Sequence, residues 1–197
     1  NLTIAQGDPF YTQTLSEYNN AITQRNALLK TLSERGGDAA QLDYWDGLIA
    51  NRGARLLHAR IVALRELDQI AARIHDRLTG AKEVLRLIYQ PSYDPLPRIK
   101  GQFSLPIQTQ TNRDGFTVDQ IEQGFLGQLV QIRAEEIARG VTTIGPHRDE
   151  IRIHSNGIDL TDFGSRGQIR TALLSLKLAE VEWLKQKTTQ WPVLLLD

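Results

Sequence analysis

The chain has 197 residues, of which 41% are hydrophobic and 23% charged, a composition that excludes global disorder and suffices for one large domain or two small ones. Lysine plus arginine and aspartate plus glutamate number 23 each, so the net charge is zero and nucleic-acid binding would depend on local charged patches. Cysteine is absent, no apolar run reaches the roughly 18–20 residues of a membrane span, and the N-terminus lacks a signal-peptide pattern, so we expect a cytoplasmic protein with no membrane association.

A first helix is predicted from residues that recur at spacings of three and four, which places them in one seam along a helix. Five of the six are apolar, and the paired glycines Gly36 and Gly37 supply the positive φ that ends a helix. The seam consists of Leu15, Tyr18, Ile22, Arg25, Leu29 and Leu32.

A second, longer helix is predicted from an apolar stripe that begins at Ala39 and continues to the stop at Thr79-Gly80. Asp38 is the expected N-cap, with Gln41 at the reciprocal position of a capping box, and Gly53 makes a bend or break possible. Because a short turn joins the two helices, we expect an antiparallel hairpin over residues 1–81. The pattern leaves open whether this hairpin is a compact bundle or a projecting arm.

The remaining residues, 82–197, mix strand and helix patterns. Strands are predicted at 83–89 and on both sides of Asn156-Gly157 up to Leu160, and helices at 118–139 and 166–187. The helix at 166–187 is apolar on nearly all sides, so we expect heavy burial, and residues 193–196 are typical of a parallel strand buried on both faces. The predicted fold class is mixed α/β, with a helical hairpin preceding an α/β lobe.

The turn from Ser165 to Gln168 enters the last long helix and has the chemistry of a phosphate contact. The first N–H groups of a helix lack internal partners, and the helix dipole adds partial positive charge there. Gly167 allows an anion to approach closely, and the Ser165 hydroxyl can donate to a phosphate oxygen. The alternative, that Ser165 is an ordinary N-cap, stays open for the turn considered alone.

Asp197 follows the predicted strand at 193–196, at the end of a parallel strand where such sheets place their ligands. A carboxylate at this place would hold Mg²⁺ through water. The combination of the turn and Asp197, with a buried helix between them, is more specific than either alone and fits the head of an ATP-binding-cassette protein. No Gly-x-x-x-x-Gly-Lys-Ser/Thr loop occurs in the chain, so we interpret the chain as a fragment of such a protein.

Several motifs resemble those of RecF, a bacterial family of recombination-mediator ATPases related to SMC proteins. They are Pro9-Phe-Tyr11, Gln24–Leu29, Tyr44-Trp-Asp46, Gly145–Glu150, Ser165–Gln168, Leu176–Glu180 and Val193–Asp197. The resemblance spans the whole chain but only the middle and later part of the family's length, without the Walker A lobe and the C-terminal tail. Ile169 departs from the pattern, because the family often has a second glutamine there, whereas Arg166 agrees with RecF rather than with transporter cassettes.

The resemblance implies that residues 1–81 form a helical arm and that residues 82–197 form the signature and Walker B lobe of an ABC-type ATPase. It implies that Ser165, Gly167 and Gln168, with Arg166 adding charge, contact ATP bound to the opposite protomer. Asp197 would be the catalytic Walker B residue that serves Mg²⁺. ATP and Mg²⁺ are the implied cofactors of the full-length family, and the fragment alone is expected to be inactive.

The same resemblance implies a role in DNA repair, DNA replication and the SOS response. A RecF-like protein would form an ATP-dependent homodimer that binds DNA at gaps and junctions and helps RecO and RecR to load the recombinase. Between Arg52 and Arg86 eight cations outnumber four acids, so this stretch is a candidate DNA contact. The candidate residues are Arg52, Arg55, Arg60, Arg73 and Arg77, and the alternative is an ordinary solvated helix face with local ion pairs.

The segment from Gly145 to Glu150 contains His147, Arg148 and Asp149, which are residue types capable of acid–base chemistry. We favour a Gly-Pro turn before a strand, with the charges paired locally, because no partner nucleophile is evident. The histidines lack the spacing of metal ligands. For the chain as a whole, the alternative to an ATPase fragment is a non-enzymatic interaction module, a helical hairpin on an α/β base.

Overall fold

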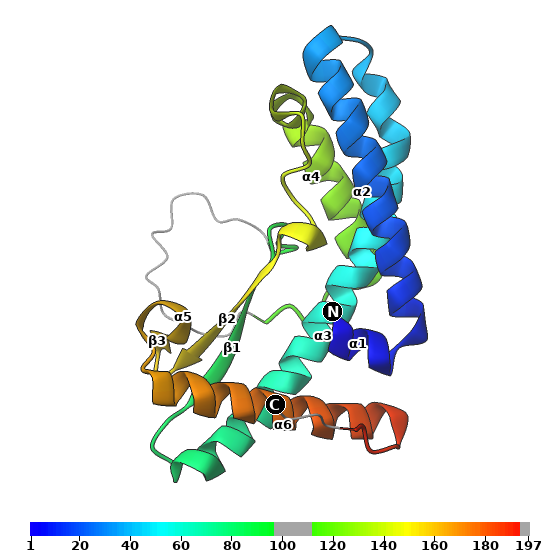
Figure 1. The fold of residues 1–197 in the computed structure, drawn as a ribbon. Helices are drawn as coiled ribbons and strands as arrows, with labels where there is room; N and C mark the ends of the chain where they lie inside the picture. The colour runs from blue at the N-terminus through cyan, green and yellow to red at the C-terminus, as the bar shows by residue number, and fades with distance from the viewer. Residues whose placement is uncertain (97–111, 194–197) are drawn as a thin grey trace.

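The computed structural model describes residues 1–96 and 112–193, in which one small sheet lies beside long helices (Figure 1). The elements in chain order are α1 (Leu2–Gly7), α2 (Pro9–Arg35), η1 (Ala39–Leu42), α3 (Asp43–Thr79), β1 (Leu85–Gln90), α4 (Val118–Arg139), η2 (Pro146–Arg148), β2 (Glu150–Ser155), β3 (Ile158–Asp159), α5 (Leu160–Phe163) and α6 (Arg166–Thr188). The predicted mixed α/β class is confirmed. Residues 194–197 of the predicted last strand lie outside the described residues.

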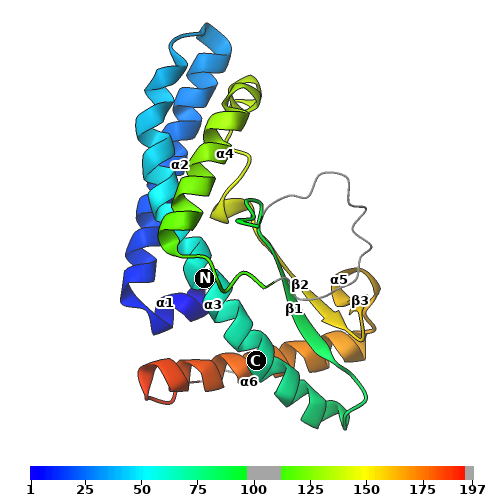
Figure 2. The same ribbon diagram turned by 180° about the vertical axis from the view of Figure 1, so that it is seen from behind.

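Three helices lie side by side and form an elongated arm, made of α2, the first half of α3 and α4 (Figures 1 and 2). The seam predicted for α2 faces the other two helices, and Tyr18 and Leu29 are fully buried in it. The arm therefore contains a third helix in addition to the predicted hairpin. The predicted boundary between residues 81 and 82 remains a prediction, and α4 lies beyond it in sequence while packing with the arm.

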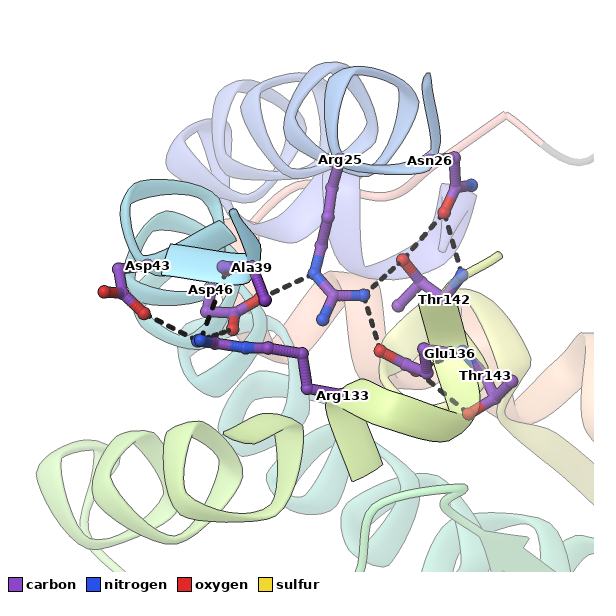
Figure 3. A network of polar contacts seen from close by, with 9 residues as sticks. All are labelled: Arg25, Asn26, Ala39, Asp43, Asp46, Arg133, Glu136, Thr142 and Thr143. Carbon is purple, nitrogen blue, oxygen red and sulfur yellow. Dashed lines mark hydrogen bonds and ion pairs between the residues drawn. The ribbon is translucent and has the colours of Figure 1, made fainter. Parts of the chain in front are cut away.

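Arg25, the polar member of the α2 seam, joins the three helices of the arm through buried ion pairs (Figure 3). Its Nε donates to Asp46 Oδ1 of α3 at 2.7 Å, and its Nη1 donates to Glu136 Oε2 of α4 at 2.6 Å and to Thr142 Oγ1 at 2.9 Å. Arg133 of α4 donates to the second carboxylate oxygen of Asp46 at 2.6 Å. A buried charge is tolerated only when it is paired and hydrogen-bonded, so this network fixes how the helices pack.

The α3 helix runs through Gly53 without a break, so the break that this glycine allowed does not occur. A Cβ atom at Gly53 would lie 2.6 Å from Phe125 Cε1 and 3.2 Å from Tyr18 Cε2. The glycine thus lets the aromatic rings of α4 and α2 approach the backbone of α3. The helix also begins later than predicted, because Asp38 caps the short η1 helix by accepting from Ala40 N at 2.8 Å.

The sheet has the order β1-β2-β3, and both strand pairs are antiparallel. The C-terminal half of α3 packs against β1, and Asp68 Oδ1 accepts from the backbone N–H of Leu87 at 2.7 Å. The predicted hairpin at Asn156-Gly157 is confirmed, and both residues have positive φ. Its second strand is shorter than predicted, because Leu160 begins the α5 helix, whose first turn is capped by Asp159.

The α6 helix lies across the C-terminal half of α3, next to the sheet (Figure 1). It buries one side, which includes Ala172, Ala179 and Trp183, against α3 and α1. Leu173 and Leu174 on another side are 47% and 43% exposed, so the expected heavy burial of this helix is wrong for the part of the chain that the structure describes. No helix within the described ranges is long and apolar enough to cross a membrane.

Candidate nucleotide-contact turn at the start of α6

The turn from Ser165 to Gln168 forms a complete capping box. Ser165 Oγ accepts from the backbone N–H of Gln168 at 3.2 Å, and Gln168 Oε1 accepts from the backbone N–H of Ser165 at 3.1 Å. The box uses Ser165 Oγ as an acceptor, so the hydroxyl hydrogen can still be donated to an incoming oxygen. Ser165 is therefore an N-cap, as the simpler alternative predicted, and this role leaves its donor capacity intact.

The turn is open to solvent, since Ser165, Arg166 and Gly167 are all exposed. The first N–H groups of a helix have no carbonyl partner inside the helix. The backbone N–H groups of Arg166 and Gly167 belong to this set. Partial positive charge from a 23-residue helix collects at the same end. The amide groups of this surface and the serine hydroxyl can donate hydrogen bonds to a phosphate oxygen.

Gly167 is not required by the fold that the described residues adopt. It lies inside the first turn of α6 with an ordinary negative φ, and an added Cβ would meet only Ser165 Oγ, at 4.0 Å. Glycine weakens a helix relative to alanine by up to about 1 kcal/mol, with less effect at the ends. A close external ligand would explain a glycine at this place, because a side chain there would block its approach.

Arg166 within the turn and Ile169 directly after it lie in different environments. Arg166 is exposed and forms no ion pair within residues 1–96 and 112–193. Ile169, the position that departs from the RecF pattern, is half-buried and packs against the hydrophobic core. The apolar side chain therefore makes a packing contact where the family often has a polar one.

Gln168 also reaches back to the segment that precedes β1. Its Nε2 donates to Glu83 Oε1 at 3.4 Å, and the other oxygen of Glu83 accepts from Ser155 Oγ at 2.9 Å. The hydrogen bonds from Ser155, His75 and Gln168 lower the pKa of Glu83, with the Ser155 bond the largest cause. Glu83 and His75 could not be predicted from sequence patterns, because they approach the turn only through the packing of α3 and α6.

Asp197, the predicted catalytic and Mg²⁺-binding residue, lies outside the described residues. Within the described ranges, no group of three or more His, Cys, Asp or Glu residues could hold a metal ion. The predicted pairing of the turn with Asp197 therefore stays a prediction.

The segment from Gly145 to Glu150 forms the short η2 helix and then enters β2. Asp149 pairs across the fold, because it accepts from Arg60 of α3 at 2.9 Å, from Tyr89 of β1 and from the backbone N–H of Ser92 at 2.9 Å. Glu150 pairs locally, as expected, with Arg152 at 3.6 Å. Burial lowers the pKa of His147, whose Nδ1 lies 2.8 Å from the Tyr18 hydroxyl. The favoured Gly-Pro turn is present, and it connects the arm to the sheet.

The five candidate DNA-contact arginines do not share one surface environment. Arg60 is buried, and its guanidinium bonds to Tyr11, Pro146 O, Asp149 and Asn1, so it is not available at the surface of this structure. Arg52 pairs with Glu17 at 2.6 Å and Arg73 with Glu182 at 3.3 Å. Arg55 and Arg77 are exposed.

No protein-family model matches the chain. Its sequence is 38% identical over 196 residues to the DNA replication and repair protein RecF of Acetivibrio thermocellus, covering 100% of this chain and 48% of that protein. RecF of Halothermothrix orenii is 37% identical over 195 residues, which cover 98% of this chain and 48% of that protein. The chain spans about half the length of the curated relatives it matches.

Two solved structures of the recombination mediator protein RecF in the RecFOR pathway are similar to the whole described fold. The RecF-ATP structure has a TM-score of 0.83 at 29% identity and covers 99% of this chain and 47% of that one. The RecF-ATPrS structure has a TM-score of 0.79 at 28% identity and covers 94% of this chain and 45% of that one.

Proposed function

We propose that this chain, a homologue of RecF along its whole length, carries the signature turn of a RecF-type ATPase. Such an ATPase would act in DNA replication and repair. The resemblance that the sequence motifs predicted is confirmed by these relatives. In this proposal Ser165, Gly167 and Gln168 contact the triphosphate of ATP that is bound to a second copy of the protein.

The observation that carries the proposal is the exposed entrance of α6. Its amides and the Ser165 hydroxyl face solvent. A Cβ atom at Gly167 would meet only Ser165 Oγ, at 4.0 Å, so the space beside this glycine is open. A helix N-terminus alone attracts many anions, but the solved RecF-ATP structure supports ATP as the ligand for a chain with this fold. The exposed Arg166 adds positive charge that would favour the γ-phosphate.

The remaining parts of the nucleotide site belong to the proposal as well. Asp197 would hold Mg²⁺ through water as the first acid of a Walker B strand, and a Walker A loop from outside this chain would bind the phosphates on the same protomer. In such a composite site ATP joins two protomers, because each supplies one half. This chain alone would then bind ATP weakly and would not hydrolyse it.

The proposed dimer would close on DNA and act with RecO and RecR as a recombination mediator in the cytoplasm. Phosphate contacts by exposed arginines such as Arg55 and Arg77 would give this DNA affinity a strong dependence on salt. Arg52 and Arg73 would have to exchange their carboxylate partners for phosphates. Arg60 is left out of the proposed DNA contact because it is buried.

Sedimentation of the full gene product that contains this chain tests the proposal, with and without a non-hydrolysable ATP analogue. We expect the analogue to convert monomers to dimers in the wild type and not in Ser165→Arg, whose large cation blocks the turn. Equal nucleotide-driven dimerisation of both proteins would contradict the proposal. Because Ser165 caps α6, this variant should lose about 1 kcal/mol of stability, and a cooperative melting transition that is only slightly lowered would show that the fold is kept.

A further inference from the structure

Glu83 lies at the meeting point of three elements that are distant in sequence. Its Oε2 accepts from Ser155 Oγ at the end of β2 at 2.9 Å and lies 3.2 Å from His75 Nε2 of α3. Its Oε1 accepts from Gln168 Nε2 in the first turn of α6 at 3.4 Å. The side chain is 22% exposed, and His75 is fully buried beneath it.

The buried ring of His75 lies within hydrogen-bonding distance of both Ser175 and Glu83. Ser175 Oγ donates its single hydrogen to Thr171 O at 2.7 Å, so it must accept from His75 Nδ1, which lies 3.0 Å away. His75 Nε2 lies 3.2 Å from Glu83 Oε2, so the buried ring connects Glu83 to Ser175 of α6 as well as to α3.

This arrangement determines which end of the Gln168 amide faces the capping box. The box requires Gln168 Oε1 to point at Ser165 N, which it does at 3.1 Å. If the amide were flipped, its NH₂ group would meet the Ser165 N–H and its oxygen would meet Glu83, and neither contact could be a hydrogen bond. The carboxylate of Glu83 therefore selects the one orientation in which the box closes.

We propose that Glu83 is a positioning residue for the nucleotide-contact turn, held by His75 of α3 and Ser155 of β2. Through Gln168 it fixes the backbone and the hydroxyl of Ser165 relative to the C-terminal end of α3. The other half of α3 belongs to the arm, so the turn is attached to the same continuous helix that builds the arm. The inference deepens the proposed function and rests on it, since it assigns a role in that same site.

The test measures two constants for variants of the full gene product: the affinity of the monomer for an ATP analogue and the dimerisation constant when the analogue is saturating. A positioning role for the turn predicts that Glu83→Ala weakens dimerisation by roughly five- to tenfold, as expected for the loss of one charge-assisted hydrogen bond that is partly exposed. Glu83→Gln should weaken it less, because its amide oxygen can still accept from Gln168. The affinity of the monomer should change less than twofold, because the turn acts on a nucleotide held by the partner.

Glu66→Ala is the matched control, because Glu66 is a carboxylate of α3 that also holds α6. It accepts from Trp183 Nε1 at 2.7 Å and pairs with Lys187 at 2.9 Å, near the opposite end of α6 from the turn. If general loosening of α6 on α3 were responsible, Glu66→Ala would weaken dimerisation as much as Glu83→Ala does. We expect less than a twofold effect from Glu66→Ala, and an equal effect would overturn the inference.

A double-mutant cycle separates this inference from the proposed function. If Glu83 acts through Gln168, then Glu83→Ala should have no further effect on dimerisation in a Gln168→Ala background. Additive effects would overturn the inference. If Ser165→Arg abolishes dimerisation while Glu83→Ala has no effect, the positioning role fails and the proposed function stands. If Ser165→Arg also has no effect, both fail.

Discussion

Arg25 of α2 and Glu136 of α4 are 111 positions apart in the chain, yet Arg25 Nη1 and Glu136 Oε2 are 2.6 Å apart in a fully buried ion pair. Asp46 of α3 completes the contact on the other side of the guanidinium. One arginine thus joins three helices, and we expect it to dominate the stability of the arm.

Replacing Arg25 with methionine should lower the free energy of unfolding by about 3 kcal/mol or more, because the buried carboxylate of Glu136 loses its cation. Urea denaturation at neutral pH measures the change. Lys30→Ala is the control, since Lys30 pairs with Glu34 at 3.8 Å with side chains 72% and 56% exposed. This variant should change stability by less than about 0.5 kcal/mol. Similar effects of the two substitutions would contradict the assigned role of Arg25.

Two glycines of α3 should respond to alanine with opposite signs. Gly53→Ala forces a methyl group against Phe125 and Tyr18, and we expect a loss of about 1–3 kcal/mol. Gly47 has no atom within 4 Å of its would-be Cβ, so Gly47→Ala should stabilise the helix by up to about 1 kcal/mol. Thermal unfolding of the two variants distinguishes them. A stabilising Gly53→Ala would show that the aromatic rings do not pack as described.

Gly167→Ala should change the stability of the protein and its ATP-dependent dimerisation in opposite directions. The added methyl group fits into open space and should stabilise α6 slightly, by up to about 1 kcal/mol, while it weakens ATP-dependent dimerisation of the full gene product. Gly127→Ala, on an exposed part of α4 with open space around it, should stabilise its helix without affecting dimerisation. Unimpaired dimerisation of Gly167→Ala would mean that no ligand needs the space.

Glu83 should make stability depend on pH in the acid range. Its pKa in the folded chain is lowered, chiefly by the Ser155 hydrogen bond, so the unfolded chain binds more protons there and the contribution of Glu83 is present above its ordinary pKa of about 4.3. That contribution is lost as the pH falls through the lowered pKa. The wild type should therefore exceed Glu83→Gln in stability at pH 7, and the difference should shrink below about pH 4. A difference independent of pH in urea denaturation would contradict this.

The helices of the arm could be predicted because the sequence features that mark a helix lie within the helix itself or next to its ends. The seam of α2 and the stop at Gly36 follow from spacing and from glycine chemistry, and α4 was predicted with the bounds that the structure has. The docking of α4 could not be predicted, because periodicity identifies an apolar face but not its partner. The same limit explains the shortened β3, where capping by Asp159 begins a helix that strand alternation does not reveal.

The candidate site was predictable in part for the same reason. Ser165 and Gln168 form a motif within four residues, so their capping box is a local property of the sequence. Glu83 is 85 positions from Gln168, and its contact with the turn depends on how α6 crosses α3. Arg60 illustrates the converse, since a cationic residue on a long helix gives no sign in sequence that it is buried against Asp149.

The central claim is that the entrance of α6 contacts a triphosphate held by a second copy of the protein. The most direct measurement is cross-linking of the full gene product with ATP that carries a photoreactive group on its γ-phosphate, followed by peptide mapping. We expect label on residues 165–168 at protein concentrations that give dimers, and loss of that label on dilution to monomers. Label that persists unchanged in monomers, or dimers in which residues 165–168 remain unlabelled, would contradict the claim.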